Sequence, residues 1–457
     1  MADLTESEFL SLSRQLPGLV SMPGDGRYAA ATGIWAKPAG AMPRAVVHCR
    51  NAEDVQAAIR AVRERDLVLS VRGGGHDWAG RALCDGIVID LSGMRDVVVG
   101  ADRRTATISG GARAADAVAV TDPFGLAVVA GSAGVVGMAG LTLGGGYGPL
   151  IGRFGLALDN LLAAQVVLAD GRIVSADPEN NAELFWALRG GGGNFGVVTA
   201  MRHRLHDLPG VHSGMLVYPF SEAKSVLGRC AEIAASMPEE VTIQVGIVAD
   251  PGGSLMVLVV PTWSGPREQG EARLAPFLRL GTLLAGHIEW KSYRALLATF
   301  EAHIVNGLRT FMETCWIPDL DSVSIDVFID AMANAVSPGC AIITHEFKGA
   351  ASRVAADATA FGLRRDHLLV EILAAFPDRS DPLDERQHRH WARATREAFT
   401  AALPGGYPNL LGRGDAERAA SSYGGNAERL IKAKLLYDPD NVFASAIPLP
   451  PRRQPCA

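Results

Sequence analysis

Residues 70–80 read Ser70-Val71-Arg72-Gly73-Gly74-Gly75-His76-Asp77-Trp78-Ala79-Gly80. The apolar run 67–71 before the glycines predicts a short buried strand. Glycine allows positive φ and a close approach of the backbone to a ligand. Successive N–H groups in such a turn can bind an anion, and Arg72 adds a permanent charge suited to phosphate. The stretch therefore predicts an anion-binding turn that presents His76 at its mouth. The alternative is a plain glycine turn with an incidental surface histidine.

Length and composition narrow the class of protein. A chain of 457 residues with 48% hydrophobic and 20% charged residues is typical of a globular protein of two or three domains. The net charge of −6 argues against a nucleic-acid partner. We see no secretory signal at the start and no apolar run of membrane-spanning length, so a cytoplasmic protein without a membrane partner is expected. The six cysteines lack CxxC spacing, and no metal site is indicated.

Two further glycine clusters follow the first. One runs from Ala130 to Gly148, and the other covers residues 189–196 and leads into an apolar strand. The glycines between 144 and 148 lack the spacing and the following amphipathic helix of a dinucleotide-binding fingerprint. After about residue 205 glycine becomes sparse, and strands alternate with helical stretches. This shift predicts a domain boundary.

The ordered set of motifs resembles the berberine-bridge-enzyme-like covalent FAD-dependent oxidases of the vanillyl-alcohol-oxidase (PCMH-type) superfamily. The resemblance covers nearly the whole chain. The matching segments are Pro23-Gly24-Asp25 with Tyr28 and Trp35, Arg72–His76, 84–91, 144–148, Asp159-Asn160, 184–198, Tyr407-Pro408-Asn409 and 437–443.

The resemblance implies an α+β fold. It predicts a PCMH-type FAD-binding domain of two α/β subdomains over residues 1–205. A substrate domain with an antiparallel sheet backed by helices would cover residues 206–410. Residues 411–457 would return to the FAD domain as a berberine-bridge-like C-terminal segment. The glycine clusters would then hold the FAD pyrophosphate and line the flavin.

In this family the histidine at the position of His76 is bonded to the 8α-methyl carbon of the flavin. Many members carry a second link through a cysteine, but that position here is Ala133, so a single link through His76 is expected. The C-terminal segment also lacks the family's usual asparagines after Phe443. The resemblance assigns cofactor binding to His76, Arg72, Gly73, Gly74, Gly75, Asp77, Gly137, Gly140, Gly144, Gly145, Asn194, Gly196, Val198, Tyr407 and Asn409.

Three residues are predicted to be catalytic. In related oxidases the tyrosine at the position of Tyr407 lies over the flavin and takes the substrate proton, although a phenol needs help to act as a base near neutrality. Tyr147 is expected beside the flavin, either packing on it or bonding the substrate. Glu346, next to His345, is a candidate base or a residue of a solvated strand face. Glu371 is the second carboxylate candidate.

These residues predict an oxidase that moves a hydride from an alcohol or amine carbon of a small organic substrate, natural products included, to flavin N5. O2 would then take the electrons and form H2O2. The alternatives are a dehydrogenase with another acceptor, an oxygenating tailoring enzyme of secondary metabolism and a non-catalytic flavin-binding protein. The substrate and the oligomeric state are not predicted.

Overall fold

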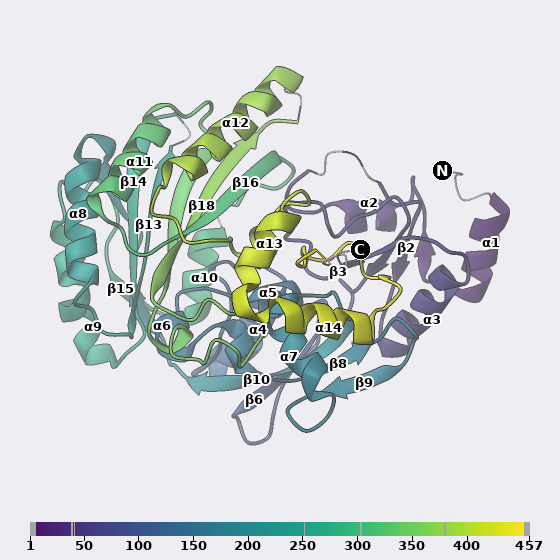
Figure 1. Cartoon of the computed structure of the whole chain (residues 1–457). Coiled ribbons are helices and arrows are strands. Elements are labelled where there is room, and N and C mark those ends of the chain that lie inside the picture. Colours follow the sequence, from purple (N-terminus) through teal and green to yellow (C-terminus); the bar gives the residue numbers. More distant parts are fainter. Residues whose placement is uncertain are drawn as a thin grey trace.

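The computed structural model describes residues 6–37, 40, 42–250, 252–301, 304–378 and 381–451, so the ends of the predicted first and last segments (1–5 and 452–457) lie outside it. Three sheets organise these residues (Figure 1). The first two come from the N-terminal half of the chain. The third, larger sheet is built from residues after 210. The predicted α+β class is confirmed, and the exact domain boundaries stay a prediction.

The first sheet has the order β1-β2-β4-β3, with parallel pairing of β2, β4 and β3. Its core strand β4 is buried along its whole length, as expected for a parallel sheet covered by helices. The Asn51 side chain caps α3 by accepting from the Asp54 N–H at 2.8 Å, and the apolar face of that helix packs on the sheet. The elements are α1 (Glu6–Gln15), β1 (Val20–Ser21), α2 (Gly26–Thr32), β2 (Ala45–His48), α3 (Ala52–Arg63), β3 (Leu69–Arg72) and β4 (Ile87–Asp90).

The second sheet is antiparallel, with the order β5-β6-β10-β8-β9, and β7 pairs with the far end of β10. The glycine-rich segments lie between its strands. The elements are β5 (Val97–Val99), β6 (Thr105–Ser109), α4 (Ala114–Thr121), β7 (Leu126–Val128), α5 (Met138–Gly144), α6 (Ile151–Phe154), β8 (Leu161–Val167), β9 (Ile173–Ala176), α7 (Ala182–Gly191) and β10 (Val197–Asp207).

The third sheet is antiparallel, with the order β15-β11-β14-β13-β17-β18-β16, and β12 pairs with β14. Helices α8, α11 and α12 cover its outer face, while α6 touches β13 and β17 from the side of the glycine-rich segments (Figure 1). The strands are β11 (Val211–Ser213), β12 (Leu216–Pro219), β13 (Val241–Ala249), β14 (Leu255–Trp263), β15 (Glu289–Lys291), β16 (Arg309–Ile317), β17 (Cys340–Phe347) and β18 (His367–Phe376). The helices are α8 (Ala223–Ala234), α9 (Arg267–Leu274), α10 (Tyr293–Glu301), α11 (Ser322–Ala333) and α12 (Pro382–Ala398).

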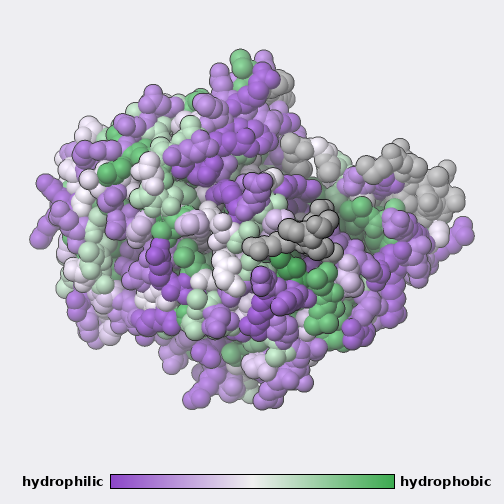
Figure 2. Space-filling model, viewed as in Figure 1, coloured by the Kyte–Doolittle hydropathy of each residue, from purple (hydrophilic) through white to green (hydrophobic). Residues whose placement is uncertain are grey.

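The chain then returns to its first half. Helices α13 (Ala416–Tyr423) and α14 (Ala427–Tyr437) follow the third sheet, and α14 packs on α7 (Figure 1). The visible surface is largely hydrophilic, and apolar atoms gather near α14, which exposes Leu435 and Leu436 (Figure 2). None of the described helices is both long enough and apolar enough to cross a membrane.

Candidate active site

The glycine turn begins where β3 ends. Arg72 is buried there, and its Nη1 donates to Asp90 Oδ1 at 3.0 Å on the neighbouring strand. Asp90 also accepts from the Ser92 hydroxyl at 2.8 Å. The guanidinium therefore supports the turn from beneath, and a contact between Arg72 and phosphate stays a prediction.

His76 follows the turn and lies flat on Trp35. The two ring centroids are 4.4 Å apart with an interplanar angle of 13°. The backbone N–H of Trp35 donates to the Gly75 carbonyl at 2.9 Å. Burial lowers the pKa of His76 to about 4, so the imidazole is neutral at physiological pH. Asp77 accepts from the backbone N–H groups of Ala79 and Ala82 at 3.0 and 2.7 Å. Its carboxylate therefore caps the next turn, and its contact with the cofactor stays a prediction.

The first glycine turn meets the start of α5. A Cβ atom on Gly74 would lie 2.4 Å from the Gly137 Cα, so only glycine allows this approach. Gly73 lies beside the same junction, and its Cβ would be 3.2 Å from the Gly110 carbonyl. One turn into α5, Gly140 is exposed, and no atom lies within 4 Å of where its Cβ would be. The two segments together form a backbone cradle with open space in front of Gly140.

The Tyr407 loop closes over the end of α5. The Tyr407 hydroxyl accepts from the Gly146 N–H at 2.7 Å, and Asn409 Nδ2 donates to the Gly140 carbonyl at 2.7 Å. Gly145 has φ 145°, and a Cβ there would lie 2.6 Å from the Tyr407 oxygen. A Cβ on Gly144 would lie 2.4 Å from Asn409. The predicted Tyr407 and Asn409 therefore do meet the second glycine cluster.

Tyr147 links this loop to the third sheet. Its hydroxyl donates to Glu371 Oε1, and its ring lies 4.3 Å from the His345 ring and 5.1 Å from the Tyr407 ring, centroid to centroid. His345 Nε2 is 3.3 Å from the same Glu371 oxygen. Burial raises the pKa of Glu371, but His345 and the hydrogen bond from Tyr147 outweigh it, and the net pKa lies below the usual value. Glu371 is thus a buried carboxylate that is ionised near neutrality.

Glu346 lines the pocket described below, but both of its carboxylate oxygens are already paired. Its Oε2 accepts from the Ile243 N–H at 2.6 Å, and its Oε1 accepts from Lys348 Nζ at 3.0 Å. The backbone pairing between β13 and β17 stops at Gly246. Beyond it, the side chains of Glu346 and Thr344 on β17 accept from backbone N–H groups of β13, where β17 carbonyls would otherwise do so. Burial raises the pKa of Glu346. The carboxylate fastens two strands together, and its predicted catalytic role gains no support from these contacts.

The remaining predicted residues lie around the start of β10. Asn194 Nδ2 donates to the Gly191 and Ile447 carbonyls at 2.8 and 2.9 Å, so it ties the C-terminal segment to the third glycine cluster. Gly196 is tightly packed, since its Cβ would lie 2.5 Å from Val166. The Val198 carbonyl packs against Gly110, where a Cβ would lie 2.3 Å from it. Gly110 also lies beside Gly73 of the glycine turn.

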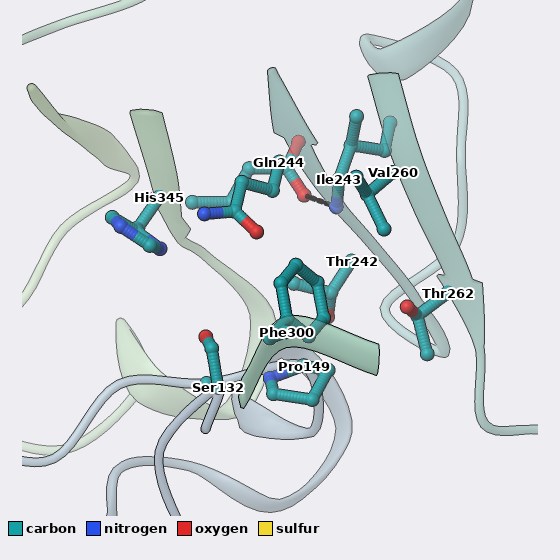
Figure 3. Close-up of a pocket in the computed structure, with 11 residues that line it drawn as sticks. Ser132, Pro149, Thr242, Ile243, Gln244, Val260, Thr262, Phe300 and His345 are labelled. Atoms are coloured by element: carbon teal, nitrogen blue, oxygen red, sulfur yellow. Dashed lines mark hydrogen bonds between the residues drawn. The ribbon is translucent and has the colours of Figure 1, made fainter. Parts of the chain in front are cut away.

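A pocket opens beside His345 between the glycine-rich segments and the third sheet (Figure 3). Ser132 and Pro149 form one wall, the β13 residues Thr242 and Gln244 form another, and Phe300 lies across it. The lining combines an aromatic ring with hydroxyl and amide groups. The lining therefore places hydrogen-bonding groups and an apolar surface beside His345.

Two residues are more central to the site than the sequence suggests. From the sequence, Glu371 is only the second carboxylate candidate, and His345 is only the neighbour of Glu346. The sequence signal for both was a polar side chain in an otherwise apolar strand, which costs free energy unless it is paired. His345 on β17 and Glu371 on β18 pair with each other, which offsets the cost of burying both side chains.

Comparison with known proteins agrees with this geometry. Residues 43–177 match the family described as FAD binding domain, and residues 406–450 match the family described as berberine and berberine like. The chain belongs to the berberine-bridge-like FAD-dependent oxidoreductases. The predicted family is confirmed, and this berberine-bridge-like protein is an FAD-dependent enzyme.

Individual relatives cover almost the whole chain. (R)-6-hydroxynicotine oxidase of Paenarthrobacter nicotinovorans is 29% identical over 456 residues, which are 96% of this chain and 97% of the relative. The crystal structure of 6-hydroxy-D-nicotine oxidase from Arthrobacter nicotinovorans has a TM-score of 0.86 at 28% identity and covers 96% of this chain and 98% of that one. A glucooligosaccharide oxidase of Acremonium strictum, whose FAD is 6-S-cysteinyl and 8α-N1-histidyl, shares the fold with a TM-score of 0.84 at 24% identity, covering 98% and 100%.

The residues present fit FAD. The cradle of Gly74 and Gly137 exposes backbone without side chains, and open space lies in front of Gly140. His76 offers a neutral ring nitrogen at the mouth of the turn. Turn residues 73–76 and the start of α5 would hold the cofactor from one side, and Tyr407 and Asn409 would border it from the other.

Proposed function

We propose that the protein is an oxidase whose FAD is linked covalently to His76 and whose reduced flavin is reoxidised by O2 to give H2O2. The imidazole supports the link because it is neutral, and a neutral ring nitrogen has the lone pair needed for a bond to the flavin 8α carbon. Ala133 leaves no thiol for a second link. When bound, FAD supplies the hydride acceptor.

We infer that Tyr147 and Glu371 remove the substrate proton. The observation that carries this inference is the hydrogen bond from the Tyr147 hydroxyl to the Glu371 carboxylate, at the junction of the glycine-rich segments and the third sheet. The substrate O–H or N–H proton moves to the Tyr147 oxygen while Tyr147 passes its own proton to Glu371. Loss of this proton would let the substrate carbon give its hydride to bound FAD, with formation of a C=O or C=N bond.

Tyr407 is a weaker candidate for the base. Burial raises the pKa of both phenols, so each keeps its own proton near neutrality and the difference lies in their partners. Tyr147 can pass its proton to the Glu371 carboxylate, whereas the Tyr407 oxygen accepts from the Gly146 N–H. Its role in this proposal is to hold the 144–146 segment and to present an aromatic edge beside Tyr147.

The substrate is a small alcohol or amine. Support comes from the pocket beside His345, where Gln244, Thr242 and Ser132 offer hydrogen bonds and Phe300 offers an apolar surface. The carboxylate of Glu371 favours a substrate whose reacting carbon bears a hydroxyl or amine group, because that group has a proton to give.

The test is a panel of small aromatic, alicyclic and sugar alcohols and amines, read by H2O2 release. Peroxide in proportion to the oxidised product supports an oxidase. Turnover only with an artificial electron acceptor would indicate a dehydrogenase, and a product heavier by one oxygen atom would indicate an oxygenase. A Glu371→Gln variant that releases peroxide at the wild-type rate would contradict the proton-transfer assignment.

A further inference from the structure

The loop that follows His76 is bonded to the loop that follows Tyr407. Arg81 Nη1 donates to the Leu411 carbonyl at 2.6 Å, and its Nη2 donates to the Asn409 carbonyl at 2.5 Å. The two loops are separated by about 330 residues in the chain. A single side chain from the first loop therefore fixes two backbone positions of the second.

A second arginine reaches in the opposite direction. Arg413 Nη2 donates to the carbonyls of Gly80 and Leu83 at 2.6 and 2.9 Å. Trp78 Nε1 adds a bond to the Leu410 carbonyl at 3.1 Å. Each loop thus supplies an arginine that satisfies carbonyl groups of the other loop.

Both guanidinium groups donate their hydrogen bonds to backbone carbonyls. Among the described residues neither has a carboxylate within 4.0 Å, and burial lowers the pKa of Arg81. Arg81 therefore holds a buried charge without a direct ionic partner, which is costly, whereas Arg413 lies at the surface. General cohesion between two loops needs only apolar packing, whereas forked donors fix particular carbonyls at particular distances.

The fixed carbonyls lie next to the functional groups. Asn409, whose carbonyl Arg81 holds, donates through its side chain to Gly140 in the backbone cradle. Gly80 and Leu83 lie in the turn that the Asp77 carboxylate caps directly after His76. The arginines therefore relate the position of His76 to that of the Tyr407–Asn409 segment.

We propose that Arg81 and Arg413 form a clamp that positions His76 for attachment of the flavin. This rests on the proposed function, in which His76 carries the FAD. Attachment forms a bond between an imidazole nitrogen and the 8α carbon. One hydrogen leaves the methyl group and one leaves the ring nitrogen, both are taken up with two electrons by the flavin, and O2 then reoxidises it to give H2O2.

The clamp makes a specific prediction for attachment rates. A misplacement of about 1 Å can slow a positioned reaction by about 10²-fold without removing binding. Arg81→Met and Arg413→Met should therefore bind FAD with a Kd within a few-fold of wild type but attach it about 10- to 100-fold more slowly. Arg81→Lys, which can reach one carbonyl but not two, should recover part of the rate.

The experiment uses full-length apo-protein made under riboflavin limitation and given FAD. Acid-precipitated flavin is followed with time, and the Kd is measured separately by quenching of flavin fluorescence. Arg50→Met is the matched control, because Arg50 is an exposed arginine paired with Asp54 outside both loops. Its attachment rate should equal that of wild type.

The outcomes separate the two proposals. If Arg81→Met and Arg413→Met fold, bind FAD and attach it within two-fold of the wild-type rate, the clamp is wrong while the covalent link stands. If Arg81→Met does not fold, Arg413→Met decides, since this side chain lies closer to the surface. A wild-type protein that never attaches flavin overturns the proposed link and the clamp with it.

Discussion

The Tyr147 hydroxyl donates a hydrogen bond to the Glu371 carboxylate, and this bond connects the two halves of the molecule. Tyr147 lies on the glycine-rich segment after α5, whereas Glu371 lies on β18 of the third sheet. His345 on the adjacent strand contacts both. A proton released near Tyr147 therefore has a buried carboxylate to receive it.

Replacing Glu371 by Gln should remove the proton acceptor while the shape of the site stays the same. We expect anaerobic flavin reduction by any working substrate to slow by about 10²- to 10⁴-fold, the usual worth of general acid–base catalysis. Reoxidation of pre-reduced enzyme by O2 should change much less. Stopped-flow absorbance at the flavin band measures both steps. Glu346→Gln is the control carboxylate variant and should reduce within a few-fold of wild type.

Tyr407→Phe should act mainly on stability. Removing the hydroxyl leaves the buried Gly146 N–H without its acceptor, which costs about 1–3 kcal/mol. Flavin reduction should slow far less than in Glu371→Gln. Thermal unfolding of the variant measures the loss of stability, and stopped-flow absorbance of the same preparation measures the rate of flavin reduction. A reduction rate as low as that of Glu371→Gln would return Tyr407 to the role of base.

Gly140→Ala separates cofactor binding from folding. Nothing lies within 4 Å of the added Cβ, and alanine is favoured over glycine in a helix by about 1 kcal/mol, so the apo-protein should be at least as stable as wild type. If the cofactor occupies the space in front of Gly140, FAD binding should weaken by about 1–3 kcal/mol, the cost of overpacking. Gly228→Ala, in α8 and equally open, is the control that should keep full affinity. Titration calorimetry with FAD on apo-protein compares the three. Equal affinities would place the cofactor elsewhere.

Acid should destabilise the protein through buried histidines. Burial lowers the pKa of His203, His206 and His367 to about 4, against an ordinary value of 6.5. Between these values the unfolded chain binds more protons than the folded one, so stability falls as the pH drops from about 6.5 toward 4 and is insensitive to these groups above that window.

His203→Leu tests this pH dependence. His203 is fully buried, and neither ring nitrogen has a hydrogen-bond partner within the described ranges, so an apolar side chain can replace it. The difference in melting temperature between pH 8 and pH 5 should shrink in this variant. The exposed His390→Leu serves as the control and should keep the wild-type difference. An unchanged difference in His203→Leu would contradict the assignment of a lowered pKa.

The sequence predicted the parts of the site that depend on local backbone. The turn before His76 follows from a glycine motif with fixed local geometry. The contact of Tyr407 with Gly146 joins segments 261 residues apart, and only the family resemblance placed both beside the same cofactor. The choice between Glu346 and Glu371 depends on sheet register. In the β17–β18 ladder, His345 pairs with Leu369 and Glu346 with Leu368. Because side chains alternate between faces, His345 and Glu371 share the face toward Tyr147, and Glu346 takes the other. No local pattern in either strand reveals that pairing.

The covalent link is the central claim, and the mass of the peptide that contains His76 tests it most directly. We predict that acid-denatured wild-type protein stays yellow and that its tryptic His76 peptide carries one FAD. The Ala133 peptide should be unmodified, and His76→Ala should release all of its flavin on denaturation. Wild-type protein that loses its whole flavin on denaturation, with an unmodified His76 peptide, would contradict the account.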